Sequence, residues 1–290
     1  GIPDVFSLRR LWIGRLKNGE VPDAEVSVDE LLAKALRVPR NNLVAHWSTE
    51  PSDDQVFQFE QLVQKRLERH PLQYLLEEWS FFNLSLCCSP GTLIPRPETE
   101  DWLELFSGQF LVPQFGDSPW RFADIGTGTG AIGLYLRSRF PETQGVLGDL
   151  SLEALRTAAT NLALHSKLGD ELLLMRAHLT SSLRAHSIDV LVSNPPYIPS
   201  AEIPLLMPEV RDHEPHQALD GGTDGLELIR IILADASRVL RPGGLLALEH
   251  GHGQRQAILQ LPAPDLTVLS SLDDAAGRER AMIWKTRRTA

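Results

Sequence analysis

Two short motifs, at residues 124–131 and 192–197, carry residue types suited to binding a cofactor and holding a nitrogen group. The first, Asp-Ile-Gly-Thr-Gly-Thr-Gly-Ala at residues 124–131, continues from a short hydrophobic stretch. Glycines are needed where a strand turns sharply into a helix, because a Cβ would block the turn or a ligand lying against the backbone. The pattern therefore predicts a cofactor-binding loop, and a tight turn without a ligand is the less favoured interpretation.

The glycines alone leave two kinds of cofactor open. Gly126, Gly128 and Ala131 match the G-x-G-x-x-G/A fingerprint, in which a dinucleotide pyrophosphate lies on a helix N-terminus. The same loop also suits S-adenosylmethionine, whose ammonium group Asp124 could attract. Asp149, about 20 residues further on, can accept hydrogen bonds from the ribose hydroxyls of either cofactor. An alternative role for Asp149 is to cap the helix that follows.

The second motif, Val-Ser-Asn-Pro-Pro-Tyr at residues 192–197, resolves this ambiguity. Two consecutive prolines cannot continue a central strand, so the chain must leave the sheet in a stiff, extended form. Pro195 and Pro196 then hold the Asn194 side chain and the Pro195 carbonyl as acceptors, with the ring of Tyr197 beside them. Two acceptors can take the two hydrogens of a planar NH2 group while the ring covers one of its faces. This arrangement has no evident use in hydride transfer.

Alternating strands and helices are expected to position both motifs. Strands are predicted at residues 121–125, 145–149, 171–175, 188–193 and 245–249, with weaker ones near 266–269 and 281–285. Helices are predicted at residues 131–140, 151–164 and 226–240. Strands separated by helix-length segments indicate an α/β fold with a mostly parallel, doubly wound, Rossmann-like sheet, which binds ligands at the carboxyl ends of its strands.

The first seventy residues have the periodicity of helices and contain no glycine-rich turn. Apolar residues recur at helical spacing after Ser27, an expected N-cap with Glu30 three residues later. A second helix is expected to begin at Ser52 and to end before Pro71. This part of the chain therefore predicts a small all-helical domain, whose role is either packing or gripping a partner.

A connector separates the helical part from the cofactor-binding part. Residues 81–87 alternate as a strand does, a turn follows, and two prolines then flank Arg96. We therefore expect a helical domain at residues 1–74, a connector with a β-hairpin at 75–100 and a cofactor-binding domain at 101–290.

Composition excludes several classes of protein. The 290 residues are 42% hydrophobic and 23% charged, unlike collagen-like, coiled-coil or wholly disordered chains. A net charge of −10 argues against stable binding of long nucleic acid by general phosphate attraction. The neighbouring Cys87 and Cys88 predict neither a disulfide framework nor a zinc site, and no apolar run approaches the roughly 20 residues of a membrane helix. We expect a cytoplasmic protein without a metal or a membrane partner.

Six segments together resemble one known family, the protein-(glutamine-N5) methyltransferases of peptide-chain release factors. They are the two motifs above and Leu-Ile-Pro-Arg-Pro-Glu-Thr-Glu at 93–100, Pro-Glu-Val-Arg-Asp-His-Glu-Pro at 208–215, Ala-Leu-Asp-Gly-Gly at 218–222 and Leu-Glu-His-Gly at 248–251. The Asn-Pro-Pro-Tyr piece is shared with nucleic-acid adenine methyltransferases, whereas residues 93–100 are far more specific. The resemblance covers nearly the whole chain, including the helical domain.

The resemblance implies a class I methyltransferase fold and a reaction. The family uses S-adenosylmethionine to methylate the side-chain amide of the glutamine in the Gly-Gly-Gln loop of release factors. Position by position, it assigns cofactor contacts to Asp124, Gly126, Thr127, Gly128, Thr129, Gly130, Asp149, Leu179 and Asn194. It assigns the glutamine amide to Asn194, Pro195, Pro196 and Tyr197. At residues 177–179, Ala-His-Leu replaces the family's usual Asp followed by a hydrophobic or aromatic residue, at the expected adenine contact.

Two other functions remain open at this point. Transfer to the amino group of adenine in DNA or RNA would use the same loop on a flipped base, and the acidic charge counts against it. A cofactor-binding scaffold without catalysis is the second, and the intact residues 194–197 argue against it.

The remaining polar residues receive ordinary roles. His213, Glu214 and His216 are expected in a solvated or substrate-lining loop rather than as metal ligands. Glu227 and Arg230 are expected to pair on one helix face. His250 and His252 are expected to form hydrogen bonds, and Arg96 either anchors the connector or meets the substrate.

Overall fold

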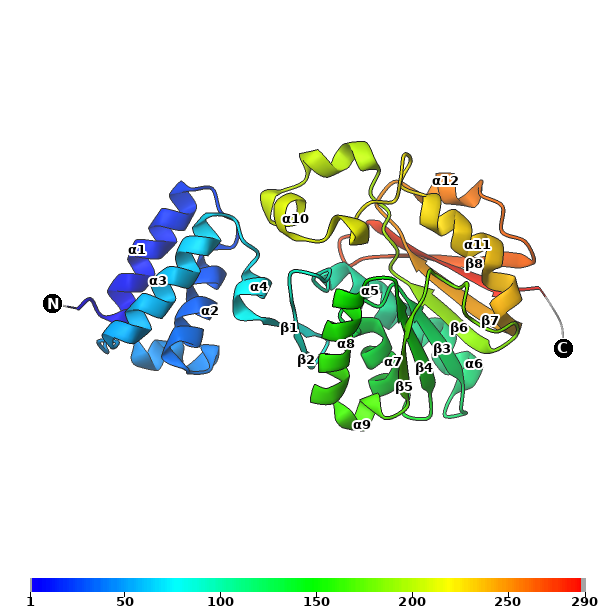
Figure 1. Ribbon diagram of the computed structural model, residues 1–290, viewed down its shortest axis with the longest axis horizontal. Helices are drawn as coiled ribbons and strands as arrows, with labels where there is room; N and C mark the ends of the chain where they lie inside the picture. Colours follow the sequence, from blue (N-terminus) through cyan, green and yellow to red (C-terminus); the bar gives the residue numbers. More distant parts are fainter. Residues whose placement is uncertain (1, 288–290) are drawn as a thin grey trace. The chain divides into compact units, whose positions relative to one another are not determined.

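The computed structural model describes residues 2–287, which form two compact units. The first is helical and comprises the chain up to Glu78 together with residues 207–213. The second is an α/β unit of residues 79–206 and 214 onward (Figure 1). The short segment 207–213 therefore belongs with the helices, although it lies between two stretches of the α/β unit in the sequence.

The helical unit is built from amphipathic helices. Its elements are α1 (Val5–Asn18), α2 (Ala24–Leu36), the 3-10 turn η1 (Arg40–His46), α3 (Asp53–Leu67), α4 (Leu72–Leu76) and α10 (Pro208–His213). In α1, Val5, Leu8, Trp12 and Leu16 are buried at intervals of three or four residues, which places them on one face of the helix. The burial of such faces against one another forms the core of this unit.

Of the two predicted helix starts in this unit, one is right and the other is wrong. The predicted start of α3 is confirmed, because the Ser52 hydroxyl accepts from the Gln55 backbone N–H in a capping box. The predicted cap at Ser27 is wrong, since α2 already begins at Ala24. Ser27 lies fully buried inside the helix, where its hydroxyl accepts a hydrogen bond of 3.0 Å from Nε of Arg66. The Ser27 hydroxyl, which the local sequence assigned to a helix cap, therefore binds a side chain from another helix instead.

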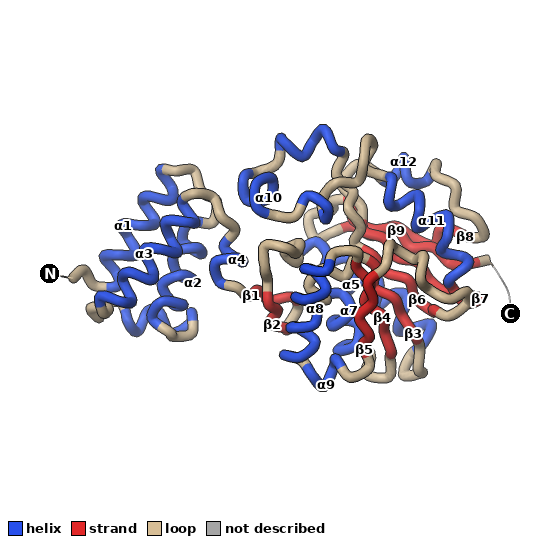
Figure 2. The backbone as a smooth tube through the Cα atoms, in the orientation of Figure 1, coloured by secondary structure: helices blue, strands red, loops and turns tan. Residues whose placement is uncertain are grey.

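The α/β unit contains a hairpin and a seven-stranded sheet (Figure 2). The hairpin strands are β1 (Glu78–Phe81) and β2 (Leu84–Cys87). The sheet strands are β3 (Arg121–Ile125), β4 (Gln144–Asp149), β5 (Leu172–Arg176), β6 (Ile188–Ser193), β7 (Leu240–Glu249), β8 (Leu266–Asp273) and β9 (Glu279–Thr286). Their spatial order is β5-β4-β3-β6-β7-β9-β8, with β5 to β7 parallel and β9 antiparallel to both neighbours. The predicted doubly wound sheet is confirmed.

Helices cover both faces of this sheet. Its helical elements are α5 (Pro97–Phe106), the π-helical η2 (Ser107–Leu111), α6 (Val112–Phe115), α7 (Ala131–Arg139), α8 (Leu152–Leu164), α9 (Ser166–Gly169), η3 (Ser200–Leu205), η4 (His216–Ala218), α11 (Glu227–Val239) and α12 (Arg255–Leu259). One core cluster joins α5 and α7 to Phe122, Leu147 and Val190, and the other joins α11 and α12 to Leu191 and Leu246. Successive strand residues thus point into opposite cores, as a buried parallel sheet requires.

One predicted strand boundary differs from the structure. The strand predicted at residues 245–249 is longer in the structure, because β7 already begins at Leu240 and includes the Arg-Pro-Gly-Gly residues 241–244. The pairing with β6 changes register between Ile188 and Val190, so the Pro-Gly-Gly segment is accommodated as an irregularity within the strand.

Candidate active site

The two motifs emerge side by side from the middle of the sheet. Strands β3 and β6 pair in parallel, with Ile125 opposite Ser193. The Ser193 hydroxyl donates a 2.6 Å hydrogen bond to the Ile125 carbonyl, which ties the last residues of the two strands together. The glycine loop and the Asn-Pro-Pro-Tyr loop therefore share one carboxyl edge, where the strand order reverses and doubly wound sheets bind ligands.

The glycine loop turns back tightly over the neighbouring strand. The backbone N–H groups of Gly126 and Thr127 both donate to the Gly148 carbonyl at 2.9 Å. Gly126 and Gly128 have φ angles of +71° and +56°, in the left-handed region that favours glycine. A Cβ placed on Gly126 would lie 4.0 Å from the backbone oxygen of Asn194, so the two loops approach each other closely.

Asp124 lies beneath the loop rather than on its surface. Its side chain is completely buried, and Oδ2 accepts from the Thr127 hydroxyl at 2.7 Å and the Gly133 N–H at 3.1 Å. Its Oδ1 is buried and has no hydrogen-bond donor within the described residues. Burial raises the pKa of Asp124 to about 7, although the two hydrogen bonds oppose the shift. The buried Oδ1 is therefore an acceptor that lacks a donor.

Asp149 links the glycine loop to the next helix. Its Oδ2 accepts from the Gly128 N–H at 3.0 Å, and Oδ1 accepts from the Ser151 N–H at 2.9 Å. Burial raises the pKa of Asp149, and these backbone hydrogen bonds work against that increase. The Ser151 hydroxyl caps α8 through Ala154, so Asp149 is not needed as the side-chain cap of this helix.

A cavity of about 550 Å³ opens beside these loops. Among the predicted site residues, those that line it are Gly126, Gly128, Asp149, Leu179, Asn194 and Pro196. Those that lie outside its lining are Asp124, Thr127, Thr129, Gly130, Pro195 and Tyr197. The structure thus divides the predicted residues into a group that lines the cavity and a group that lies outside its lining. In the second group, Thr127 holds Asp124, and the Thr129 carbonyl accepts from Nδ2 of Asn161 at 2.8 Å.

Leu179 has a backbone conformation that is uncommon outside glycine. Its φ is +48°, and it lines the cavity together with His178. Strained backbone of this kind is retained where the surrounding structure requires a particular side-chain position. The departure of residues 177–179 from the family pattern therefore lies directly on the cavity wall.

Sequence reasoning missed much of the cavity wall. Residues 91–93 and most of residues 215–223 also line it. These stretches overlap the segments 93–100, 208–215 and 218–222, which carried the family resemblance but received no site assignment. The family resemblance of these segments was therefore the signal that could have identified them as part of the cavity wall.

Several secondary predictions are also decided. Nη1 of Arg96 donates to the Ile94 carbonyl and Nη2 to the buried carboxylate of Glu214, which also accepts from the Ile94 N–H at 3.0 Å. Arg96 therefore anchors the connector. The predicted pair of Glu227 with Arg230 is wrong, because Arg230 binds Asp224 instead, with Nη1 3.0 Å from Oδ1.

The two histidines that follow β7 differ in burial. His250 is buried and its Nδ1 donates to the Gly251 carbonyl at 2.8 Å, whereas His252 is exposed. Across residues 2–287, no group of three or more His, Cys, Asp or Glu side chains is arranged to hold a metal ion. No helix in the same range is long and apolar enough to cross a membrane.

Comparison with known proteins places the chain in a family. Residues 7–76 match the model of the PrmC N-terminal domain, and residues 106–206 match the methyltransferase small domain. A release factor glutamine methyltransferase from Bradyrhizobium diazoefficiens is 40% identical over 88% of this chain and 84% of its own length. Another, from Nitratidesulfovibrio vulgaris, is 36% identical over 92% of this chain and 90% of its own. The chain belongs to the release factor glutamine methyltransferase family.

Solved structures support the fold of this release factor glutamine methyltransferase family member. A methyltransferase from Pyrococcus furiosus has a TM-score of 0.54 at 18% identity, over 78% of this chain and 98% of that one. The catalytic domain of hMettl16, in complex with an RNA hairpin, also has a TM-score of 0.54, at 16% identity over 72% of this chain and 77% of that one. At such identities the likeness establishes the methyltransferase fold alone.

Proposed function

We propose that this chain methylates the side-chain amide nitrogen of the glutamine in the Gly-Gly-Gln loop of peptide-chain release factors. S-adenosylmethionine is the methyl donor and S-adenosylhomocysteine is released. The observation that carries the proposal is the meeting of the glycine loop and residues 194–197 at one carboxyl edge, beside a cavity of about 550 Å³. The family membership established above supplies the substrate class.

The residues around the cavity fit S-adenosylmethionine. A Cβ on Gly128 would meet no protein atom within 4 Å, so the backbone there leaves open space for a ligand. Oδ1 of Asp124 lacks a hydrogen-bond donor, and the ammonium group of S-adenosylmethionine would supply one. Asp149 lines the cavity and retains acceptor capacity for ribose hydroxyls, while Leu179 offers an apolar surface to the adenine.

The chain's own residues have to position a poor nucleophile. S-adenosylmethionine, when bound, supplies a methyl group already activated on a sulfonium. The amide nitrogen is weakly nucleophilic because its lone pair is delocalised into the carbonyl. Acceptance of its two hydrogens by the Asn194 side chain and the Pro195 carbonyl favours positive charge developing on nitrogen, and it orients the lone pair toward the methyl group. In this proposal Tyr197 covers one face of the amide.

The two units take separate roles in this proposal. The helical unit, which matches the PrmC N-terminal domain, grips the release factor, and the α/β unit performs the transfer. The enzyme works in the cytoplasm on a protein substrate and does not bind nucleic acid stably, in keeping with its net charge of −10.

Methyl transfer to purified release factor tests the proposal directly. With methyl-labelled S-adenosylmethionine, we expect label in the release factor and none in a matched release factor whose Gly-Gly-Gln glutamine is replaced by alanine. DNA and RNA are offered in parallel reactions. Label in the nucleic acid alone would assign the loop to adenine, and label in no substrate despite cofactor binding would indicate a scaffold.

The proposed contact with Asp124 predicts a pH-dependent cofactor affinity. Burial raises the pKa of Asp124 to about 7, so its carboxylate is increasingly protonated below that pH. An ammonium group binds the ionised form, so affinity is retained above the pKa and lost as the pH falls through it. Calorimetry should show the Kd of S-adenosylmethionine rising about 15-fold from pH 7 to about pH 5.5. The Asp124→Asn variant should bind weakly and without this dependence, whereas an equal dependence in the variant would refute the contact.

A further inference from the structure

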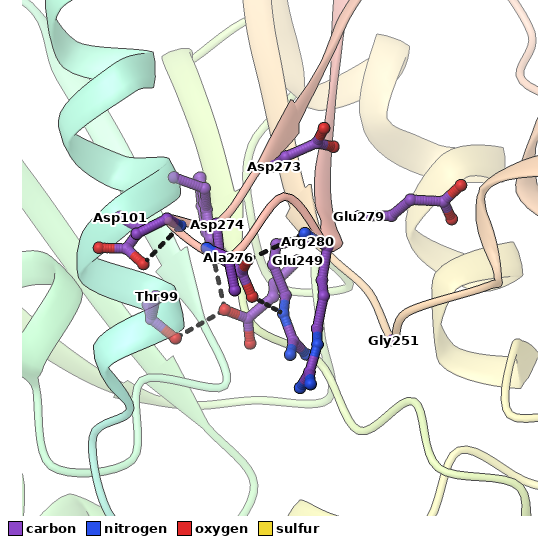
Figure 3. Close-up of polar contacts among 12 residues, drawn as sticks. Thr99, Asp101, Glu249, Gly251, Asp273, Asp274, Ala276, Glu279 and Arg280 are labelled. Carbon is purple, nitrogen blue, oxygen red and sulfur yellow. Dashed lines mark hydrogen bonds and ion pairs between the residues drawn. The ribbon is translucent and has the colours of Figure 1, made fainter.

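A fully buried carboxylate stands behind the Asn-Pro-Pro-Tyr loop. Glu249 is the last residue of β7 and is 1% exposed. Its Oε1 accepts from the Thr99 hydroxyl at 2.6 Å (Figure 3). It also accepts from Nε1 of Trp102 at 2.8 Å, and both donors lie on α5. Burial raises the pKa of Glu249, and these two hydrogen bonds oppose the shift. Burial of a charge costs free energy unless the charge is fully hydrogen-bonded. An apolar residue would therefore be more stable at a position needed only for packing.

The second oxygen of this carboxylate faces the catalytic loop. Oε2 of Glu249 accepts from the Tyr197 hydroxyl at 3.4 Å. Burial, reinforced by the nearby Glu249, raises the pKa of the Tyr197 phenol, which therefore remains a protonated donor at neutral pH. The Tyr197 backbone is held as well, because its carbonyl accepts from Nε2 of Gln254 at 2.8 Å. Both ends of Tyr197 are thus fixed by residues that follow β6 by more than 50 positions in the sequence.

Charges of both signs act on Glu249. Arg280 on β9 lowers the pKa of Glu249 electrostatically, whereas Glu98 raises it. Nε of Arg280 itself donates to Oδ2 of Asp274 at 2.9 Å. Figure 3 shows the Arg280 side chain beside Glu249, whereas Glu279 points away from it. The carboxylate is therefore flanked by one cation and three hydrogen-bond donors.

We propose that Glu249 is a positioning residue that sets the orientation of the Tyr197 ring. It fixes the phenol end of the ring, while α5 fixes Glu249, so that the ring stays over the substrate amide that Asn194 and the Pro195 carbonyl hold. This role rests on the proposed function of residues 194–197. Glu249 itself touches neither the substrate nor the methyl group in this arrangement.

A double-mutant cycle separates this role from a purely structural one. Glu249→Gln keeps the shape of the side chain but replaces the acceptor that faces Tyr197. We expect it to lower kcat about 10- to 100-fold, the scale of a small misplacement at a reacting centre, with the Kd of S-adenosylmethionine changed less than about twofold. Tyr197→Phe should lower kcat similarly. Glu249→Gln added to Tyr197→Phe should then cause less than about a twofold further loss. An equal loss in both backgrounds, or full kcat in Tyr197→Phe, overturns the proposal.

Two control variants distinguish a loss of positioning from a loss of folding, and thermal unfolding of each variant shows whether it is folded. Glu279→Gln alters a carboxylate on the adjacent strand that accepts from the Gly253 N–H at 3.2 Å, and it should leave kcat unchanged. Thr99→Val removes a donor from Oε1 but leaves Oε2 facing Tyr197, so kcat should fall much less than in Glu249→Gln. If Glu249→Gln does not fold, Tyr197→Phe and Thr99→Val decide the question alone: equal losses in these two overturn the proposal.

An activity-independent measurement keeps this inference distinct from the proposed function. The chain has three tyrosines, so the ring signals of labelled tyrosine can be assigned with Tyr197→Phe. Glu249→Gln should shift or broaden the Tyr197 signal and spare the other two. Inactivity of the unmodified enzyme on release factor together with this spectral change would defeat the proposed function but keep the positioning role. Activity with an unchanged Tyr197 signal would defeat the positioning role alone.

Discussion

Replacement of Asn194 by alanine is expected to lower methyl transfer to release factor by about 100- to 1,000-fold, the scale seen when one group that stabilises transition-state charge is removed. Truncation deletes an acceptor for an amide hydrogen, and that acceptor matters most when positive charge develops on the nitrogen. The affinity for S-adenosylmethionine should change only a few-fold, because Asp149, Leu179 and the glycine loop remain in the cavity wall. The measurements are single-turnover transfer of labelled methyl and calorimetric binding of the cofactor.

A matched control is available for this experiment. Asn83 is an exposed asparagine in the turn between β1 and β2, so Asn83→Ala should leave both transfer and binding unchanged. If a correctly folded Asn194→Ala protein transferred methyl at the full rate, the assignment of residues 194–197 to the substrate amide would be wrong.

Replacement of Glu209 by alanine is expected to lower the free energy of unfolding of the helical unit by about 3–5 kcal/mol. Glu209, in α10, is 6% exposed and accepts from Arg66 at 3.3 Å and from Arg69 at 2.7 Å. Arg66 is itself 4% exposed, and burial lowers its pKa against the opposing influence of Glu209. Alanine would leave this guanidinium buried without its carboxylate partner, which costs far more than the net value of the pair.

Urea denaturation followed by hydrogen exchange in α2 and α3 measures this loss in the relevant unit. The control is Glu60→Ala, on an exposed position of α3, with an expected change within about 0.5 kcal/mol. Replacement of Arg66 by methionine together with Glu209 by leucine should recover most of the stability, because no buried charge is then left unpaired. A loss below about 1 kcal/mol in Glu209→Ala would show that the hydrogen bonds of Arg66 to Ser27 and to the carbonyls of Pro22 and His70 suffice to hold the buried guanidinium.

Features that depend on local chemistry could be predicted from the amino-acid order alone. Glycine and proline restrict the backbone wherever they occur, so residues 124–131 and 192–197 were recognisable as loops leaving strands. The alternation of strands and helices likewise defined the parallel sheet, because each element has its own hydrophobic period. The start of α3 at Ser52 could also be predicted, since the signals that begin a helix lie within a few residues of it.

Contacts between side chains that are far apart in the sequence could be identified only in the folded structure. Ser27 was assigned to a cap because local sequence cannot reveal that Arg66, 39 residues later, takes its hydroxyl. The sequence also could not show that Asp124 is completely buried beneath the glycine loop, with Oδ1 left without a donor among the described residues. Thr99 meets Glu249 across 150 residues, and Glu209 meets Arg66 across 143. Burial and pairing of charges depend on the packed whole, because the environment that sets their energies exists only after distant segments have come together.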